Sequence, residues 1–139
     1  MILALETMDT DRNRELIRRW LAFGEAGFNG DFDEFIARHY VGHIGGGNDM
    51  DRAELERLER NYAVAFGDVR YEIQDLIAEG DRVVLRVESS GTHRAEFVGI
   101  PATGRRVTNT GIVIYRIEDG KIAESWAEMD FMRLLRQLR

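Results

Sequence analysis

Apolar residues recur at helical spacing in the first half of the chain and alternate with polar residues in the second half. The first helical stripe lies within residues 9–23, and either Asp9 or Thr10 can cap the start of that helix. Residues 1–9 are then expected to form a flexible lead-in before the helix.

Two further helices are predicted in the first half. Residues 32–40 predict a short helix, and residues 52–66 predict a longer one that Asp49 or Asp51 can cap. Three glycines interrupt the segment between them, which is expected to be a short strand or a loop. The residues expected to face inward are Phe32, Phe35 and Ile36 in the first helix, and Leu55, Leu58, Tyr62 and Ala65 or Phe66 in the second.

The pattern after Gly67 predicts a series of antiparallel strands and a short final helix. Strands are expected at 69–78, 82–93, 107–118 and 120–130, with the helix at 131–139. The Asp119-Gly120 pair predicts a tight hairpin between the last two strands. Helices followed by antiparallel strands predict an α+β fold, in which a curved sheet has helices on one side, as one domain over 1–139.

Composition and charge exclude several classes of function. The 139 residues include no Cys, which excludes disulfides, Cys-ligated zinc, iron–sulfur clusters and thiol nucleophiles. The net charge of -6 argues against a nucleic-acid partner, because phosphate binding needs a basic face. No apolar run is long enough for a membrane span, and the first residues make a poor signal peptide. We therefore expect a cytoplasmic protein.

The strand at 120–130 carries the most unusual pattern. Alternation places Ile122, Glu124, Trp126, Glu128 and Asp130 on one face, and Ala123, Ser125, Ala127 and Met129 on the other. A carboxylate that is desolvated beside an aromatic residue and other acids has a raised pKa and can act as general base and then as general acid. The alternative is that Asp130 caps the helix that follows it.

Other polar residues suggest chemistry less directly. His43 and His93 lie near the ends of strand-like segments, where a His can shuttle a proton or donate a hydrogen bond to an oxyanion. No metal site is expected at the His39/His43 pair, because Gly42 interrupts the segment. Arg86 and Glu88 share a strand face, where they could hold a water for epoxide opening or form an ordinary cross-strand ion pair.

The last third of the chain resembles the SnoaL-like polyketide cyclases, also called ester cyclases, of the nuclear transport factor 2-like superfamily. The residues that carry the resemblance are Gly91-Thr92-His93, Glu96-Phe97, Gly99-Ile100-Pro101, Thr103-Gly104, Tyr115-Arg116, Asp119-Gly120-Lys121-Ile122, Glu124, Trp126 and Asp130. His43 stands where the family commonly has a His. Ala95, Ala102 and Ser125 depart from the pattern, which leaves open a different substrate or a loss of cyclase activity.

The resemblance implies a cone-shaped α+β fold, in which a curved sheet wraps around helices and leaves an apolar pocket. It implies a cyclase or isomerase that needs no metal or organic cofactor and closes a ring in a hydrophobic, carbonyl-rich molecule by an aldol-type reaction. Asp130 would be the general acid/base, and His43, His93 and Asn109 would orient or polarise carbonyls. Substrate contacts are expected from Trp126, Asn109, Tyr115, Arg86, Glu88 and Trp20.

Two alternatives to the cyclase stay open, because this fold hosts many functions. One is an epoxide hydrolase similar to limonene-epoxide hydrolase, in which Arg86, Glu88 and Asp130 would activate water. The other is a small-molecule binding protein without catalysis. The family habit also implies a homodimer through the outer sheet face, with Ala123 and Ala127 at the contact.

Overall fold

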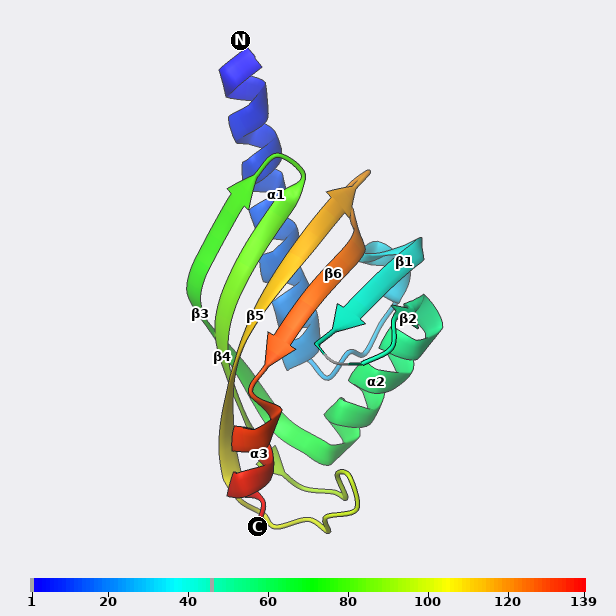
Figure 1. The fold of residues 1–139 in the computed structure, drawn as a ribbon, viewed down its shortest axis with the longest axis vertical. Coiled ribbons are helices and arrows are strands. Elements are labelled where there is room, and N and C mark those ends of the chain that lie inside the picture. The colour runs from blue at the N-terminus through cyan, green and yellow to red at the C-terminus, as the bar shows by residue number, and fades with distance from the viewer. Residues whose placement is uncertain (1, 46) are drawn as a thin grey trace.

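The computed structural model describes residues 2–45 and 47–139. Within these residues, a six-stranded sheet curves around the first helix (Figure 1). The helices are α1 (Ile2–Glu25), α2 (Arg52–Ala65) and α3 (Phe131–Gln137), and η1 (Phe32–Glu34) is a short 3-10 helix. The strands are β1 (Ile36–Ile44), β2 (Met50–Asp51), β3 (Phe66–Glu79), β4 (Arg82–His93), β5 (Arg106–Glu118) and β6 (Lys121–Met129).

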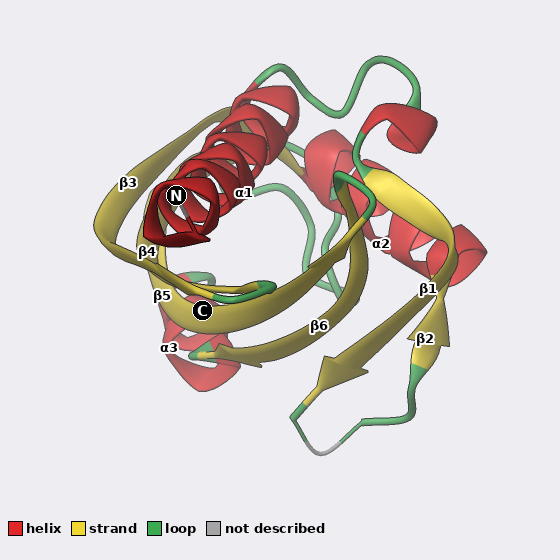
Figure 2. Cartoon of the chain, turned by 90° about the horizontal axis from the view of Figure 1, so that it is seen from above, coloured by secondary structure: helices red, strands yellow, loops and turns green. Residues whose placement is uncertain are grey.

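The sheet is strongly curved but does not close into a barrel, and α1 lies against its concave face (Figure 2). Its strand order is β2-β1-β6-β5-β4-β3, so β2 and β3 form the two edges. The predicted α+β fold is therefore confirmed. Neighbouring strands are antiparallel, as expected, except for β1 and β6, which run parallel.

Aromatic packing fixes α1 in the concave face. Trp20 is the centre of this packing, with four phenylalanine rings at centroid distances of 5.4 to 6.0 Å. Gly24, one turn later, lets β3 approach closely, because a Cβ atom there would lie 3.0 Å from the ring of Tyr71. Burial of these rings holds the helix against the sheet.

The predicted start of the first helix is wrong. α1 runs without interruption from Ile2, so Asp9 and Thr10 lie inside the helix and residues 2–9 are helical rather than a separate lead-in. Side-chain hydrogen bonds to the helix backbone explain why the threonines of this segment are compatible with a helix. The hydroxyl groups of Thr7 and Thr10 donate to backbone carbonyls one turn earlier, both at 2.9 Å.

The second predicted helix is also wrong after its first turn. Only η1 is helical, and residues 36–44 form β1, because Ile36 pairs with Ile122 of β6 in the sheet. The inward residues of this segment, Phe32, Phe35 and Ile36, are buried as predicted.

The third predicted helix is confirmed as α2. Asp51 caps it, and the Asp51 carboxylate accepts a hydrogen bond from the backbone N–H of Glu54 at 2.9 Å. Leu58 is 46% exposed, so its predicted inward position is wrong.

The hairpin at Asp119-Gly120 is confirmed, with φ of 51° and 74°, the left-handed pair that a tight hairpin turn requires.

A one-residue bulge in β6 changes the phase of that strand. Ile117 of β5 pairs with Ile122, but Arg116 pairs with Glu124, which leaves Ala123 as the extra residue. Ile122 and Ala123 are both buried, each at 1% exposure. Residues beyond the bulge therefore point to the opposite side from the one that simple alternation from Ile122 predicts.

Candidate active site

The space between the sheet and the helices is here called the interior. The bulge at Ala123 determines which side chains of β6 point into it. Ser125 is buried and Ala127 packs against the core, so these small side chains face inward. Glu124 and Trp126 lie on the outer face of the sheet. The prediction that Trp126 forms a wall of the pocket is not matched by its position, and Ala123 and Ala127 are not on the outer face expected for dimer contact.

Polar side chains from α2 and from the strands β1, β3, β4, β5 and β6 gather in the interior. We call them the interior polar cluster: Tyr40 of β1, Glu59 and Tyr62 of α2, Tyr71 of β3, Ser89 of β4, Asn109 and Tyr115 of β5, and Ser125 of β6. Sheet register brings several of them side by side, since Ser89 pairs with Asn109, and Tyr115 pairs with Ser125. The surrounding side chains are apolar, as in most small-molecule sites.

Glu59 is the acidic member of this cluster. It lies on the inward side of α2, between Leu55 one turn before it and Tyr62 one turn after it, and both neighbours pack against the core. Burial raises the pKa of Glu59 from its usual value of 4.5 to about 7. At neutral pH both protonation states of this carboxyl group are therefore populated.

The tyrosines from four different elements respond to Glu59. Burial raises the pKa of Tyr40 and Tyr62 to about 12, and the negative charge of Glu59 adds to the rise. Burial and the same carboxylate raise the pKa of Tyr71 and Tyr115 further. The hydroxyl groups are thus protonated donors around one carboxyl group, which is a suitable environment for a carbonyl substrate.

Two members of the cluster are already joined. The hydroxyl oxygens of Tyr40 and Ser125 lie 2.6 Å apart in a buried hydrogen bond that links β1 to β6.

The Oδ1 atom of Asn109 accepts a hydrogen bond from the backbone N–H of Thr110 at 3.0 Å. The amide nitrogen of Asn109 makes no hydrogen bond within the described part of the chain, so it can donate to a ligand.

His93 lies at the end of β4, fully buried, with its ring stacked on Phe66 at 5.4 Å. The backbone N–H of Thr103 donates to Nδ1 of His93 at 3.2 Å, so Nδ1 is an acceptor and the neutral ring carries its proton on Nε2. Nε2 has no partner among the described residues. The predicted donor role of His93 is compatible with this buried, unused N–H.

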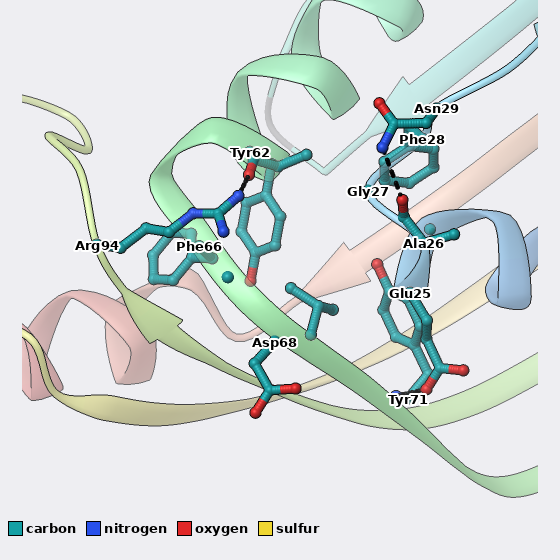
Figure 3. A pocket seen from close by; sticks show the side chains of 14 residues that line it. Glu25, Ala26, Gly27, Phe28, Asn29, Tyr62, Phe66, Asp68, Tyr71 and Arg94 are labelled. Carbon is teal, nitrogen blue, oxygen red and sulfur yellow. Dashed lines mark hydrogen bonds between the residues drawn. The ribbon is translucent and has the colours of Figure 1, made fainter.

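A pocket of about 230 Å³ lies beside the interior, between the end of α1 and the junction of α2 with β3 (Figure 3). Tyr62 and Tyr71 belong both to its wall and to the tyrosines around Glu59. Arg94 lies at the pocket and donates to the carbonyl oxygen of Ala63 at 2.6 Å. Ligand pockets usually measure roughly 300–1,000 Å³, so this pocket is smaller than most.

A second, wider groove of about 1300 Å³ runs along α1 from Leu3 to Arg19, beside the β3–β4 and β5–β6 turns. Most of the residues that line it have polar side chains, among them Glu6, Arg19 and Asp119. Neither pocket is lined by a residue that the sequence predicts to be catalytic.

His43 lies on the outer face of the sheet, away from the interior polar cluster. Its Nε2 is 2.7 Å from Glu124 and its Nδ1 is 2.7 Å from Asp49, and its ring stacks on Trp126 at 5.4 Å. The guanidinium group of Arg82 lies over the Trp126 ring, 4.8 Å from its centroid. His43, Glu124 and Trp126 therefore form a surface network that ties β1 to β6.

Asp130 follows the alternative given by the sequence. It is exposed, and its carboxylate accepts a hydrogen bond at 3.1 Å from the backbone N–H of Arg133, as the N-cap of α3. In this position the carboxylate is open to solvent and engaged in the cap of α3.

Arg86, Glu88 and Asp130 are not brought together. Arg86 is exposed and forms an ion pair with Asp75 of β3 at 2.6 Å, and Glu88 alternates with the buried Val87 and Ser89. The arrangement expected for epoxide opening is therefore not formed by these three residues. Of the predicted substrate contacts, Trp20, Asn109 and Tyr115 are buried on the inward side.

Sequence reasoning missed Glu59. The predicted apolar stripe of α2 includes Leu58 and does not include its polar neighbour Glu59. Glu59 is four residues after Leu55 and three before Tyr62, which is the spacing of one helix face. An acid at such a position is the signal that could have identified it.

The described residues contain neither a cluster of metal-binding side chains nor a helix that could span a membrane. No group of three or more His, Asp or Glu side chains that could hold a metal ion occurs among residues 2–45 and 47–139. Over the same residues, no helix combines the length and apolar character required to cross a membrane.

Comparison with known proteins identifies the family. The model of the SnoaL-like polyketide cyclase family matches residues 14–138. The aklanonic acid methyl ester cyclase DauD of Streptomyces sp. (strain C5) is 30% identical over 132 residues, which covers 89% of this chain and 80% of DauD.

Two solved structures share the fold over nearly their whole length. AclR, a proposed hydroxylase from Streptomyces galilaeus, has a TM-score of 0.85 and 28% identity, over 93% of this chain and 96% of AclR. IdmH, a proposed polyketide cyclase from Streptomyces antibioticus, has a TM-score of 0.80 and 30% identity, over 91% and 97%. The family match spans the interior polar cluster from Tyr40 to Ser125, and the chain belongs to the SnoaL-like polyketide cyclase family.

Proposed function

We propose that this protein is a cyclase that closes a ring in a hydrophobic, carbonyl-rich small molecule of the polyketide type, by general acid–base catalysis and without a cofactor. The observation that carries the proposal is the interior polar cluster, in which tyrosine hydroxyls and a carboxyl group titrating near neutrality are set in an apolar interior. A carbonyl substrate needs this combination of apolar walls, hydrogen-bond donors and an acid/base.

The chemistry follows from the substrate. A base removes a proton from a carbon between two carbonyl groups, and the enolate attacks another carbonyl of the same molecule. Buried hydroxyl and amide groups stabilise the oxyanion more strongly than water does, because they are already oriented and lie in a site of low dielectric constant. The amide of Asn109 and the N–H at Nε2 of His93 are suitable donors for this purpose.

The sequence assigns the acid/base role to Asp130, and that assignment has a direct test. Replacement of Asp130 by Asn keeps a side chain that can cap α3 but removes a proton acceptor of carboxylate strength. A hundredfold or larger loss of turnover in D130N would place the reaction at the end of β6. Turnover within about threefold of wild type would remove Asp130 from the chemistry.

The function itself is tested with a panel of aromatic polyketide esters that includes the substrate in the name of DauD, aklanonic acid methyl ester. Ring closure by an aldol reaction is an isomerisation, so the product has the mass of the substrate, with a different retention time and chromophore. We expect such a product with the wild-type protein. Binding of panel members without any product would instead support a binding protein, and the cyclase proposal would be overturned.

A matched pair of variants locates the reaction. Asn109→Leu removes an interior polar group at nearly constant volume, whereas Glu128→Gln changes an exposed residue of β6. We expect the first variant to lose turnover by tenfold or more, and the second to keep it, because removal of one oxyanion donor commonly costs about that factor or more. Diol formation from an epoxide panel would favour the hydrolase alternative.

A further inference from the structure

We infer that Glu59 on α2 is the general acid/base of the interior site, and that the strand β6 supplies none. This inference rests on the proposed function and assigns its central step to a residue that the sequence analysis did not select.

The inward positions of the sheet leave no other carboxylate for this role. After the bulge at Ala123, the inward residues of β6 are Ser125, Ala127 and Met129, and none of them is acidic. Across the described residues, the buried polar side chains are Ser89, His93, Asn109 and Ser125, and none of them is acidic. Glu59 is half-buried, and its position between Leu55 and Tyr62 on the inward face of α2 directs its carboxyl group toward the same space.

The Glu59 carboxylate is also available to a ligand. The carboxylates of Glu56, Glu118 and Glu124 each accept a hydrogen bond from Arg or His. No hydrogen bond or ion pair engages the Glu59 carboxylate within the part of the chain that the structure describes. A carboxylate that caps a helix or pairs with Arg already has a hydrogen-bond partner, whereas the Glu59 carboxylate can accept a proton from a ligand.

The groups that face Glu59 are neutral over the working pH range. The charge of Glu59 raises the pKa of four tyrosines: Tyr40 of β1, Tyr62 of α2, Tyr71 of β3 and Tyr115 of β5. These tyrosines therefore stay protonated. With neutral tyrosines around it, the titration of Glu59 should control the pH dependence of the reaction. Burial raises the pKa of Glu59 to about 7, which suits a base that must later act as an acid.

Glu59 both removes and returns the proton in this step. The carboxylate takes the proton of the activated C–H bond, and the electron pair of that bond becomes the enolate. The enolate carbon forms a bond to the second carbonyl carbon, and the π electrons of that carbonyl move to its oxygen. Glu59, now a carboxylic acid, returns its proton to this alkoxide, so no proton is consumed.

The first test measures proton abstraction alone, with 2-tetralone as a small aromatic ketone probe. Exchange of its C1 hydrogens in D2O is followed by NMR for the wild type, Glu59→Gln, Glu59→Asp and the control Glu56→Gln, an exposed neighbour on the same helix. We expect Glu59→Gln to lose a hundredfold or more of the enzyme-dependent exchange, and Glu59→Asp to recover part of it. Glu56→Gln should exchange at the wild-type rate.

The second test is the pH profile. The wild-type exchange rate should rise with pH to a plateau, with a midpoint near 7, because the base must be ionised. Unchanged exchange in Glu59→Gln, with the same midpoint, would overturn the assignment while leaving the cyclase proposal intact. Absence of both exchange and ring closure in the folded wild-type protein would overturn the proposed function, and this assignment with it.

Discussion

His43 and Glu124 meet on the outer face of the sheet, where His43 Nε2 lies 2.7 Å from a carboxylate oxygen of Glu124. Glu124 and then Asp49 raise the pKa of His43, and His43 in turn lowers the pKa of Glu124. The pair connects β1 to β6, which are the parallel strands of the sheet. These two motif residues thus stabilise a strand pairing rather than form part of the interior polar cluster.

The pH dependence of this pair is predictable. Since the pKa of His43 is raised in the folded state, its contribution to stability is complete below about pH 6.5 and is lost as the pH rises through the raised value. Glu124→Gln should therefore lower the free energy of unfolding more at about pH 6 than at about pH 9, where the bond to Arg116 remains. Urea denaturation at both pH values measures this difference, with Glu128→Gln as the control. Equal losses at the two pH values would show that His43 is not charged in the pair.

Asp130 is predicted to act on stability through its cap. Asp130→Ala should lower the free energy of unfolding by about 1 kcal/mol, because the N–H of Arg133 loses its acceptor. Asp130→Asn should cost less than half as much, because Asn is an equally good N-cap residue. Thermal and urea denaturation of the two variants check this order. A larger cost for Asn than for Ala would contradict the capping role.

The buried bond between Tyr40 and Ser125 should be strongly coupled. Ser125→Ala leaves the Tyr40 hydroxyl group without its partner and should cost about 1–3 kcal/mol of stability. Tyr40→Phe should cost a similar amount. The double variant should cost clearly less than the sum, since both changes remove the same bond. Additive losses in this cycle would show that the two hydroxyls do not interact.

The sequence was sufficient to predict the α+β fold, the strands after residue 66 and the family, because alternation and turn residues are local signals. The same patterns could not reveal which face of β6 is inward. A bulge at Ala123 reverses the phase, and the bulge exists only through the register with β5, which is a tertiary property. Trp126 was therefore expected in the pocket and lies outside it, on the same outer face as Glu124.

The segment at residues 36–40 was predicted to be a helix for a similar reason. Its apolar residues fit both helical and extended spacing, and the parallel partner that makes it a strand lies far along the chain, at Ile122. Glu59 was overlooked because polar residues are normally assigned to the exposed face of a helix. An acid on the inward face reduces stability, so it is better explained by chemistry than by folding.

The cost of burying Glu59 can be measured directly. Its folded pKa of about 7 lies above the value near 4.5 expected for an unfolded chain, so the folded state binds more protons between these two values. The contribution of Glu59 to the free energy of unfolding should therefore fall as the pH rises from about 4.5 to about 7, and then level off. A shift of this size corresponds to at most about 3 kcal/mol, reduced by the solvent that still reaches the side chain.

Glu59→Gln should abolish this dependence, because the amide does not titrate. The variant should be more stable than the wild type at about pH 8 and nearly equal to it at about pH 4.5, by urea denaturation at both values. Glu56→Gln, which loses only an exposed bond to Arg60, should stay within about 0.5 kcal/mol of the wild type at each pH. A Glu59→Gln protein that is less stable than the wild type at about pH 8 would mean that the carboxylate stabilises the fold, which would remove the reason to expect a catalytic role.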